Sequence, residues 1–222
     1  VRLLEIRCSP INYSREGLSP VRVIQVIRDE VRKHQGEMEV SLLLIASRHR
    51  QMSELWRHIE LLNDPELDQM GETPEIAGFD LAGAEDKCSP AAFRDAFLEV
   101  MRKCMHITVH AGETLPVESV WEATYHLNAE RIGHGLTLCE NPDLINKFLD
   151  RRIALEMCPS SNFQIVGFKD NYYPETSALK TYPLKQYLDA GVHVNINTDN
   201  PGISMTDMTH ELHRAARLTP GG

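Results

Sequence analysis

Several features are scarce in this sequence, and each absence excludes a class of protein. The five cysteines form no Cys-x-x-Cys pair and are odd in number, which favours reduced thiols over a disulfide framework. No apolar run is long enough to span a membrane, and we expect no signal peptide. Lys and Arg number 23 against 32 Asp and Glu, and the net charge of -9 disfavours a nucleic-acid partner. We therefore expect a cytoplasmic protein that acts without nucleic acid or membrane; the oligomeric state stays open.

Familiar catalytic and nucleotide-binding motifs are missing as well. No GxGxxG or GxxxxGK[ST] follows a strand, and no GxSxG is present, so the sequence does not predict a dinucleotide site, a P-loop or a serine hydrolase. The histidines of His210-Glu211-Leu212-His213 are three residues apart, whereas HExxH needs four, and we interpret this stretch as an exposed helix face. Cys158-Pro159 lacks the second cysteine of the zinc deaminases that carry a P-C-x-x-C signature.

The composition is that of a globular domain. The 222 residues are 42% hydrophobic and 25% charged, which is enough apolar sequence to bury a sizeable core. We expect residues 1–222 to form a single domain. Since the sequence opens at Val1 on strand-like residues and stops just after a helical run, we also expect it to be part of a longer polypeptide.

Apolar strands alternate with amphipathic helices along the whole sequence, which predicts a parallel α/β sheet. We favour a (β/α)₈ TIM-type barrel that lacks roughly its first βα unit and its C-terminal end, because a complete barrel needs about 250 residues. A doubly wound open sheet is the alternative. Strands are predicted at 1–7, 38–46, 75–83, 106–110, 131–132, 153–157 and 192–197, and helices at 20–34, 52–62, 90–104, 117–127, 142–150, 184–190 and 205–218, with a long loop after Asn162.

Reactive side chains follow several of these strands, and this favours the barrel, whose strand ends surround one point. The fourth strand ends on His110, and Ala111 and Gly112 separate that histidine from Glu113. His134 lies between two glycines that leave its imidazole uncovered, and Asp199 follows the seventh strand. Imidazole and carboxylate are the ligands that zinc prefers in a catalytic site, so we expect a zinc site that activates water at these strand ends.

Four motifs in order give the sequence a family resemblance. It is similar to the adenosine/AMP deaminase family of metal-dependent hydrolases over essentially its whole length. The motifs are Asp80-Leu81-Ala82-Gly83, His110-Ala111-Gly112-Glu113, Arg131-Ile132-Gly133-His134-Gly135 and Asn197-Thr198-Asp199-Asn200-Pro201, and residues 1–10 resemble the family's second barrel strand.

The resemblance implies a role for each matching residue. His110 and Asp199 would bind one zinc ion, while Glu113 would donate a proton to purine N1. His134 would hold a water molecule at the metal and help to deprotonate it. The substrate would be contacted by the backbone N–H of Gly83 at purine N3 and by Asn200 at N7. The implied reaction is the hydrolytic deamination of adenosine or 2′-deoxyadenosine to inosine and ammonia.

Two departures from the family pattern leave alternatives open. Asn200 stands where many members have aspartate; an amide donates a hydrogen bond to N7 at any pH, so we expect it to serve. No His-x-His, the pair that supplies two further zinc ligands in the family, occurs in the sequence. The alternatives are a deaminase of another adenine compound (adenine, AMP or ATP) and a truncated fragment without activity.

Overall fold

The computed structural model describes residues 3–34, 36, 38–50, 52–67 and 74–219. Within it the chain forms two compact units, residues 1–108 and residues 109–222, which are described separately below. Both units are built of parallel strands and helices in alternation, as the sequence predicted. The expectation of a single domain over residues 1–222 stays a prediction.

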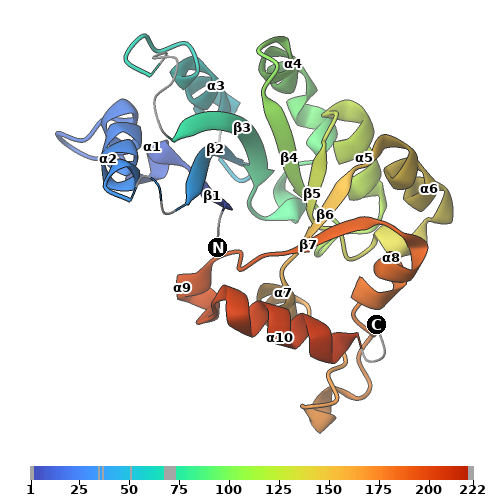
Figure 1. Cartoon of the computed structure of the whole chain (residues 1–222). Helices are drawn as coiled ribbons and strands as arrows, with labels where there is room; N and C mark the ends of the chain where they lie inside the picture. Colours follow the sequence, from blue (N-terminus) through green and yellow to red (C-terminus); the bar gives the residue numbers. More distant parts are fainter. Residues whose placement is uncertain (1–2, 35, 37, 51, 68–73, 220–222) are drawn as a thin grey trace. The chain divides into compact units, whose positions relative to one another are not determined.

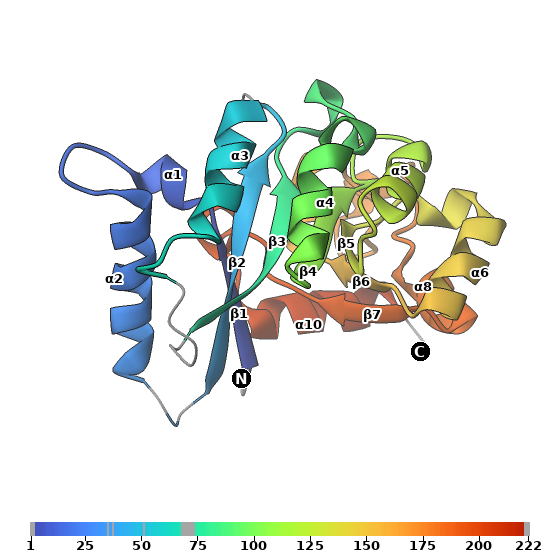
Figure 2. The ribbon, with the colours of Figure 1, turned by 90° about the horizontal axis from the view of Figure 1, so that it is seen from above.

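The first unit is built on three parallel strands that lie side by side in chain order. Leu3 of β1 pairs with Glu39 of β2, and the register between β2 and β3 shifts at Leu42 and Leu43. In Figure 2, α2 and α3 flank these strands. The elements are β1 (Leu3–Cys8), α1 (Pro10–Tyr13), α2 (Pro20–Arg32), β2 (Glu39–Ser47), α3 (Met52–Leu61), β3 (Glu75–Ala82), two 3₁₀ turns η1 (Glu85–Lys87) and η2 (Pro90–Phe93), and α4 (Arg94–Arg102).

The apolar run of β2 becomes the centre of this unit. Leu42, Leu43 and Leu44 are all completely buried although successive side chains of a strand point to opposite faces, so β2 is covered on both sides. Phe79 of β3 packs edge-on against Phe97 of α4, with 5.9 Å between the ring centroids. Burial on both faces explains why the sequence of β2 is a continuous apolar run and does not alternate between apolar and polar residues.

His58 is a completely buried histidine in α3. Its Nδ1 lies 2.9 Å from the backbone oxygen of Glu54, to which it can only donate, so the neutral ring accepts at Nε2 from the Ser9 hydroxyl, 3.0 Å away. Burial lowers the pKa of His58 from 6.5 to about 4. The imidazole therefore resists protonation as long as the unit is folded.

This shifted pKa predicts a pH-dependent stability. The unfolded chain takes up the His58 proton near its pKa of 6.5 and the folded chain only near 4, so the contribution is complete above pH 6.5 and is lost as the pH falls toward 4. At about pH 5 the loss is about 2 kcal/mol. Urea unfolding of the wild type and of His58→Gln at about pH 7.5 and about pH 5 measures this loss. Between these two pH values, the free energy of unfolding should fall by about 2 kcal/mol less in the variant than in the wild type.

The exposed His193 provides the control for this measurement. His193→Gln also removes one imidazole, but it should keep the pH dependence of the wild type. Equal losses of stability in His58→Gln and in the wild type would contradict the assignment.

The second unit begins within β4 (His106–Ala111) and contains the strands whose ends carry most of the predicted site residues. Its strands β4 to β7 follow chain order, and the pairs β5–β6 and β6–β7 are parallel. They can be followed in Figure 1 from green to orange. The other elements are α5 (Glu118–His126), β5 (Arg131–His134), η3 (Leu138–Glu140), α6 (Pro142–Arg151), β6 (Ala154–Met157), α7 (Pro159–Ile165), η4 (Pro174–Thr176), α8 (Leu184–Ala190), β7 (His193–Ile196), α9 (Pro201–Ser204) and α10 (Met208–Leu218).

The structure corrects two of the predicted elements. The helix predicted from residue 205 begins at Met208, because Met205 adopts a left-handed conformation (φ 49°) and the Asp207 side chain caps the helix by accepting from the His210 N–H. The loop predicted directly after Asn162 begins later, because helix α7 (Pro159–Ile165) continues past that residue; the helix starts at Pro159, where the fixed φ of proline suits the first helical turn.

One expectation about a helix is confirmed. His210 and His213 are exposed on α10, as expected of a surface helix face. Among the described helices, none combines the length and the apolar character that crossing a membrane requires.

Candidate active site

The ends of β4 and β5 bring two predicted site residues together in the second unit. The rings of His110 and His134 meet at 66° with 5.1 Å between their centroids. Gly133 permits this approach: a Cβ atom at that position would lie 3.2 Å from Cγ of His110. The glycine that precedes His134 therefore makes room for the other imidazole.

A strained turn holds His134 at the end of β5. His134 is left-handed (φ 66°) and so is Gly135 (φ 60°), a conformation that costs a non-glycine residue about 1–2 kcal/mol. The turn is held by hydrogen bonds from the Gly135 N–H to the Ala111 oxygen (3.0 Å) and from the Thr137 N–H to the Gly112 oxygen (3.1 Å). The hydroxyl of buried Tyr187 donates to the Gly135 oxygen at 2.7 Å. The loops that carry His134 and Glu113 are thus fixed to each other.

Gly112 allows the His110–Glu113 loop to pass close to its neighbours, and its replacement should destabilise the protein. Gly112 has φ +68°, and an added Cβ would lie 2.5 Å from Cγ2 of Val120. We expect Gly112→Ala to cost about 2–5 kcal/mol, the sum of left-handed strain (about 1–2) and overpacking (about 1–3). Gly17→Ala is the control, since Gly17 has φ +76° but nothing within 4 Å of an added Cβ, and it should show the strain alone. Urea denaturation measures both, and equal losses of stability would contradict the steric account.

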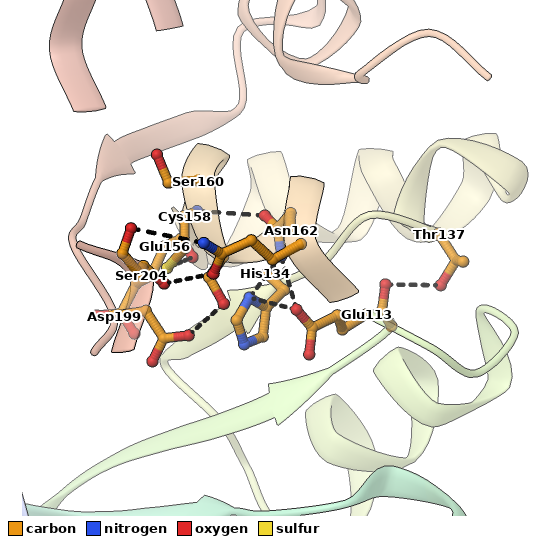
Figure 3. A network of polar contacts seen from close by, with 12 residues as sticks. Glu113, His134, Thr137, Glu156, Cys158, Ser160, Asn162, Asp199 and Ser204 are labelled. Atoms are coloured by element: carbon orange, nitrogen blue, oxygen red, sulfur yellow. Dashed lines mark hydrogen bonds and ion pairs between the residues drawn. The ribbon is translucent and has the colours of Figure 1, made fainter. Parts of the chain in front are cut away.

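Asn162, on α7, connects the predicted proton donor with the second histidine. The residue is completely buried, and its Nδ2 lies 2.8 Å from Oε1 of Glu113 and 2.8 Å from Nδ1 of His134. Its Oδ1 accepts from the Tyr182 hydroxyl (3.0 Å) and from the Cys158 N–H (3.3 Å). Figure 3 shows Asn162 between Glu113, His134 and Cys158. Burial raises the pKa of Tyr182 well above its ordinary value, so the phenol keeps the proton that it donates.

Asp199 lies beside the same histidine. It is left-handed (φ 54°), and the Ser161 hydroxyl donates to its Oδ2 at 2.6 Å. Donor atoms of His134, Cys158 and Asp199 all lie within 4.8 Å of one another. The tip of β5, the residue after β6 and a residue after β7 therefore meet at one place.

This set of donors fits a zinc ion. Nitrogen, sulfur and carboxylate oxygen are all zinc ligands, and two of them bound to one ion at about 2.0–2.3 Å lie at most about 4.5 Å apart. The donor atoms of this group lie within 4.8 Å of one another, a limit slightly wider than that spacing. Of the two predicted zinc ligands, Asp199 belongs to this group. The other, His110, packs against His134, which is also in the group.

The other predicted site residues are placed as follows. Asn200 follows Asp199 and caps α9, where its Oδ1 accepts from the Ile203 N–H at 3.3 Å and the amide nitrogen stays the donor. Gly83 follows β3 in the first unit, and its contact with a purine stays a prediction. Asp80, in the same unit, is completely buried and pairs with Arg7 at 3.4 Å.

The sequence interpretation missed the residues of α7 that contact the site. Ser161 and Asn162 were considered only as part of the polar run between the strand at 153–157 and the long loop, and Cys158 only as an incomplete zinc motif. Their position could have identified them as site residues, because this small polar run follows β6 just as the other reactive groups follow their strands.

Comparison with known proteins gives a family and a fold. A family model described as "Adenosine deaminase" matches residues 1–220. An adenosine deaminase from Enterococcus faecalis is 32% identical over 218 residues, which cover 97% of this chain and 60% of the relative. The chain thus spans about three fifths of the length of this curated relative.

Solved structures agree with the predicted fold class. An adenine deaminase from Arthrobacter aurescens matches with a TM-score of 0.77 and 23% identity, covering 98% of this chain and 62% of its own. An amidohydrolase from Burkholderia ambifaria with bound zinc matches with a TM-score of 0.81 and 19% identity, covering 100% of this chain and 59% of its own. These likenesses confirm the α/β class and the TIM-type barrel over the described strands.

Proposed function

Because this chain belongs to the adenosine deaminase family, we propose that it catalyses the zinc-dependent hydrolytic deamination of adenosine or 2′-deoxyadenosine. Water adds to C6, the bond from C6 to the exocyclic nitrogen breaks, and inosine (or 2′-deoxyinosine) and ammonia leave. The observation that carries the proposal is the group of contacts in the second unit: Asn162 joins Glu113 to His134, and Asp199 lies beside that histidine.

We assign the zinc ligands of this chain to His110 and Asp199. Asp199 belongs to the donor group described above, and His110 packs against His134 of that group. The zinc in a structural neighbour is consistent with a metal at these strand ends. A bound zinc ion would supply a water molecule whose pKa is lowered toward about 7. The remaining tasks are to move protons and to orient the purine, and these belong to side chains.

Glu113 is the proton donor in this proposal. An adenine ring accepts a nucleophile at C6 only if the charge that would gather on N1 is neutralised by a proton. Asn162 donates to Oε1 of Glu113, so a neutral Glu113 carries its hydrogen on Oε2, from which it can be given to N1. The side chain is only 16% exposed.

Asp199 and His134 act on the attacking water. The Ser161 hydroxyl holds one carboxylate oxygen of Asp199, and this bond orients the other oxygen for proton transfer. His134 holds the water from the neighbouring strand end. Asn200 would donate to purine N7 through its amide nitrogen, and Gly83 would donate its backbone N–H to N3.

The proposal is tested by comparing substrates. Adenine, adenosine, 2′-deoxyadenosine, AMP and ATP are incubated with the purified, zinc-supplemented protein, and ammonia release is measured. We expect the highest kcat/KM for the two nucleosides. Activity confined to adenine or to the nucleotides would overturn the substrate assignment and favour another adenine deaminase on the same barrel. Lack of zinc binding together with lack of turnover would favour an inactive fragment.

The cellular setting completes the proposal. We place the protein in the cytoplasm, in purine metabolism. All five cysteines are free thiols, as is usual in that reducing compartment.

A further inference from the structure

We infer that Asn162 is a positioning residue that sets the tautomer of His134 and the proton-bearing oxygen of Glu113. The inference rests on the proposed function for its catalytic meaning, but the tautomer itself can be observed without turnover. It is carried by four contacts of one buried amide, each of which the second unit fixes independently.

The orientation of the amide follows from its oxygen side. The Cys158 backbone N–H, 3.3 Å away, can only donate, so the amide atom that faces it must be Oδ1. The Tyr182 hydroxyl donates to the same oxygen at 3.0 Å. The reversed amide would place Nδ2 against the Cys158 N–H and leave two donors facing each other. Nδ2 therefore faces Glu113 and His134.

The nitrogen side then determines where the proton of His134 lies. Nδ2 has two hydrogens, and its two acceptors are Oε1 of Glu113 and Nδ1 of His134, both 2.8 Å away. Nδ1 can accept only if it carries no proton, so the neutral ring has its hydrogen on Nε2. The competing arrangement, Nδ1–H donating to Glu113, has a distance of 3.4 Å and would press two N–H groups together at 2.8 Å. The two 2.8 Å contacts of Asn162 Nδ2 therefore favour the Nε2–H tautomer of His134.

This tautomer changes how His134 serves the reaction. A neutral ring with hydrogen on Nε2 and an occupied Nδ1 donates to the oxygen of the attacking water and holds it. It has no lone pair left to remove a proton. The proton acceptor is then Asp199, whose Oδ2 is fixed by the Ser161 hydroxyl. The same amide keeps Oε1 of Glu113 as an acceptor, so one side chain prepares both proton positions.

Asn162→Asp tests the inference with little change in shape. An aspartate keeps an oxygen toward the Cys158 N–H and the Tyr182 hydroxyl but replaces the donor that faces His134 by an acceptor. In ¹⁵N-histidine-labelled protein, two-bond ¹H–¹⁵N correlation spectra report which ring nitrogen is protonated, and the His134 signals are assigned by their loss in His134→Gln. We expect Nε2–H with an unprotonated Nδ1 in the wild type, and a protonated Nδ1 in Asn162→Asp.

Controls separate positioning from general damage. Asn146→Asp makes the same charge change on the exposed face of α6 and should leave the His134 spectrum unchanged. Asn162→Ser, which removes the bridging amide without adding a carboxylate, should lose the strict Nε2–H preference. For adenosine, we expect kcat of Asn162→Asp to fall about 10–100-fold with KM nearly unchanged, the usual effect of losing a partner that orients a site group.

The outcomes are distinct. A protonated Nδ1 in the wild type, or an unchanged tautomer in a folded Asn162→Asp, would overturn the inference while leaving the proposed function in place. A wild-type protein with the expected tautomer that does not deaminate adenosine would overturn the proposed function and leave the positioning of His134 by Asn162 supported.

Discussion

Glu113→Gln is expected to lower kcat/KM for adenosine by about 10²–10⁴-fold, the range for removing a general acid. The amide has nearly the shape of the neutral carboxylic acid but cannot give a proton to purine N1. Its oxygen can still accept from Nδ2 of Asn162, so the contact that holds the side chain at 2.8 Å is preserved. The loss should fall mainly on kcat, because the proton is needed in the transition state and not for binding.

A nearby glutamate provides the matched control. Glu118 is exposed in the first turn of α5, and Glu118→Gln removes the same charge without touching the site. Its kinetics should match those of the wild type. If Glu113→Gln also kept full activity in the spectrophotometric assay of inosine formation, Glu113 would not be the proton donor.

His110→Gln is expected to weaken zinc binding by at least about 100-fold and to remove most of the deaminase activity. Loss of a partner that merely orients a metal ligand costs about 10–100-fold in affinity, and loss of the ligand itself should cost more. The change should not unfold the unit, because glutamine retains apolar carbons that can fill part of the space between His134 and Gly133. Competition with a chromogenic chelator gives the affinity, and elemental analysis gives the zinc content.

The exposed histidine at the start of β7 serves as the control for metal binding. His193→Gln should bind as much zinc as the wild type, since this side chain lies at the opposite end of its strand from Asp199. Unchanged zinc affinity in His110→Gln would remove His110 from the ligand set.

The strands and most helices could be predicted because their signals are local. The continuous apolar run around Leu42–Leu44 reflects a strand covered on both faces, and the order of strands in each unit follows the chain. The ends of parallel strands meet at one edge, so the grouping of His110, His134 and Asp199 followed from their positions once the strands were placed. The comparisons confirm the family that the four motifs predicted.

What the sequence did not predict depends on contacts between distant residues. Asn162 contacts His134 and Glu113 across 28 and 49 positions, and no spacing rule marks such an amide. Helix α7 is short and begins in a polar run, so it has no apolar periodicity from which it could be predicted. The start of α10 was misplaced by three residues because the cap lies at Asp207, behind a left-handed Met205.

The most direct test of the account follows the oxygen atom that reaches C6. Purified, zinc-supplemented protein is given adenosine in water enriched in the heavy oxygen isotope, and the product is analysed by mass spectrometry. The account predicts inosine with one heavy oxygen at C6 and one ammonia per inosine, both strongly reduced in Glu113→Gln. Adenosine that stays unchanged, or a product without the heavy oxygen, would contradict it.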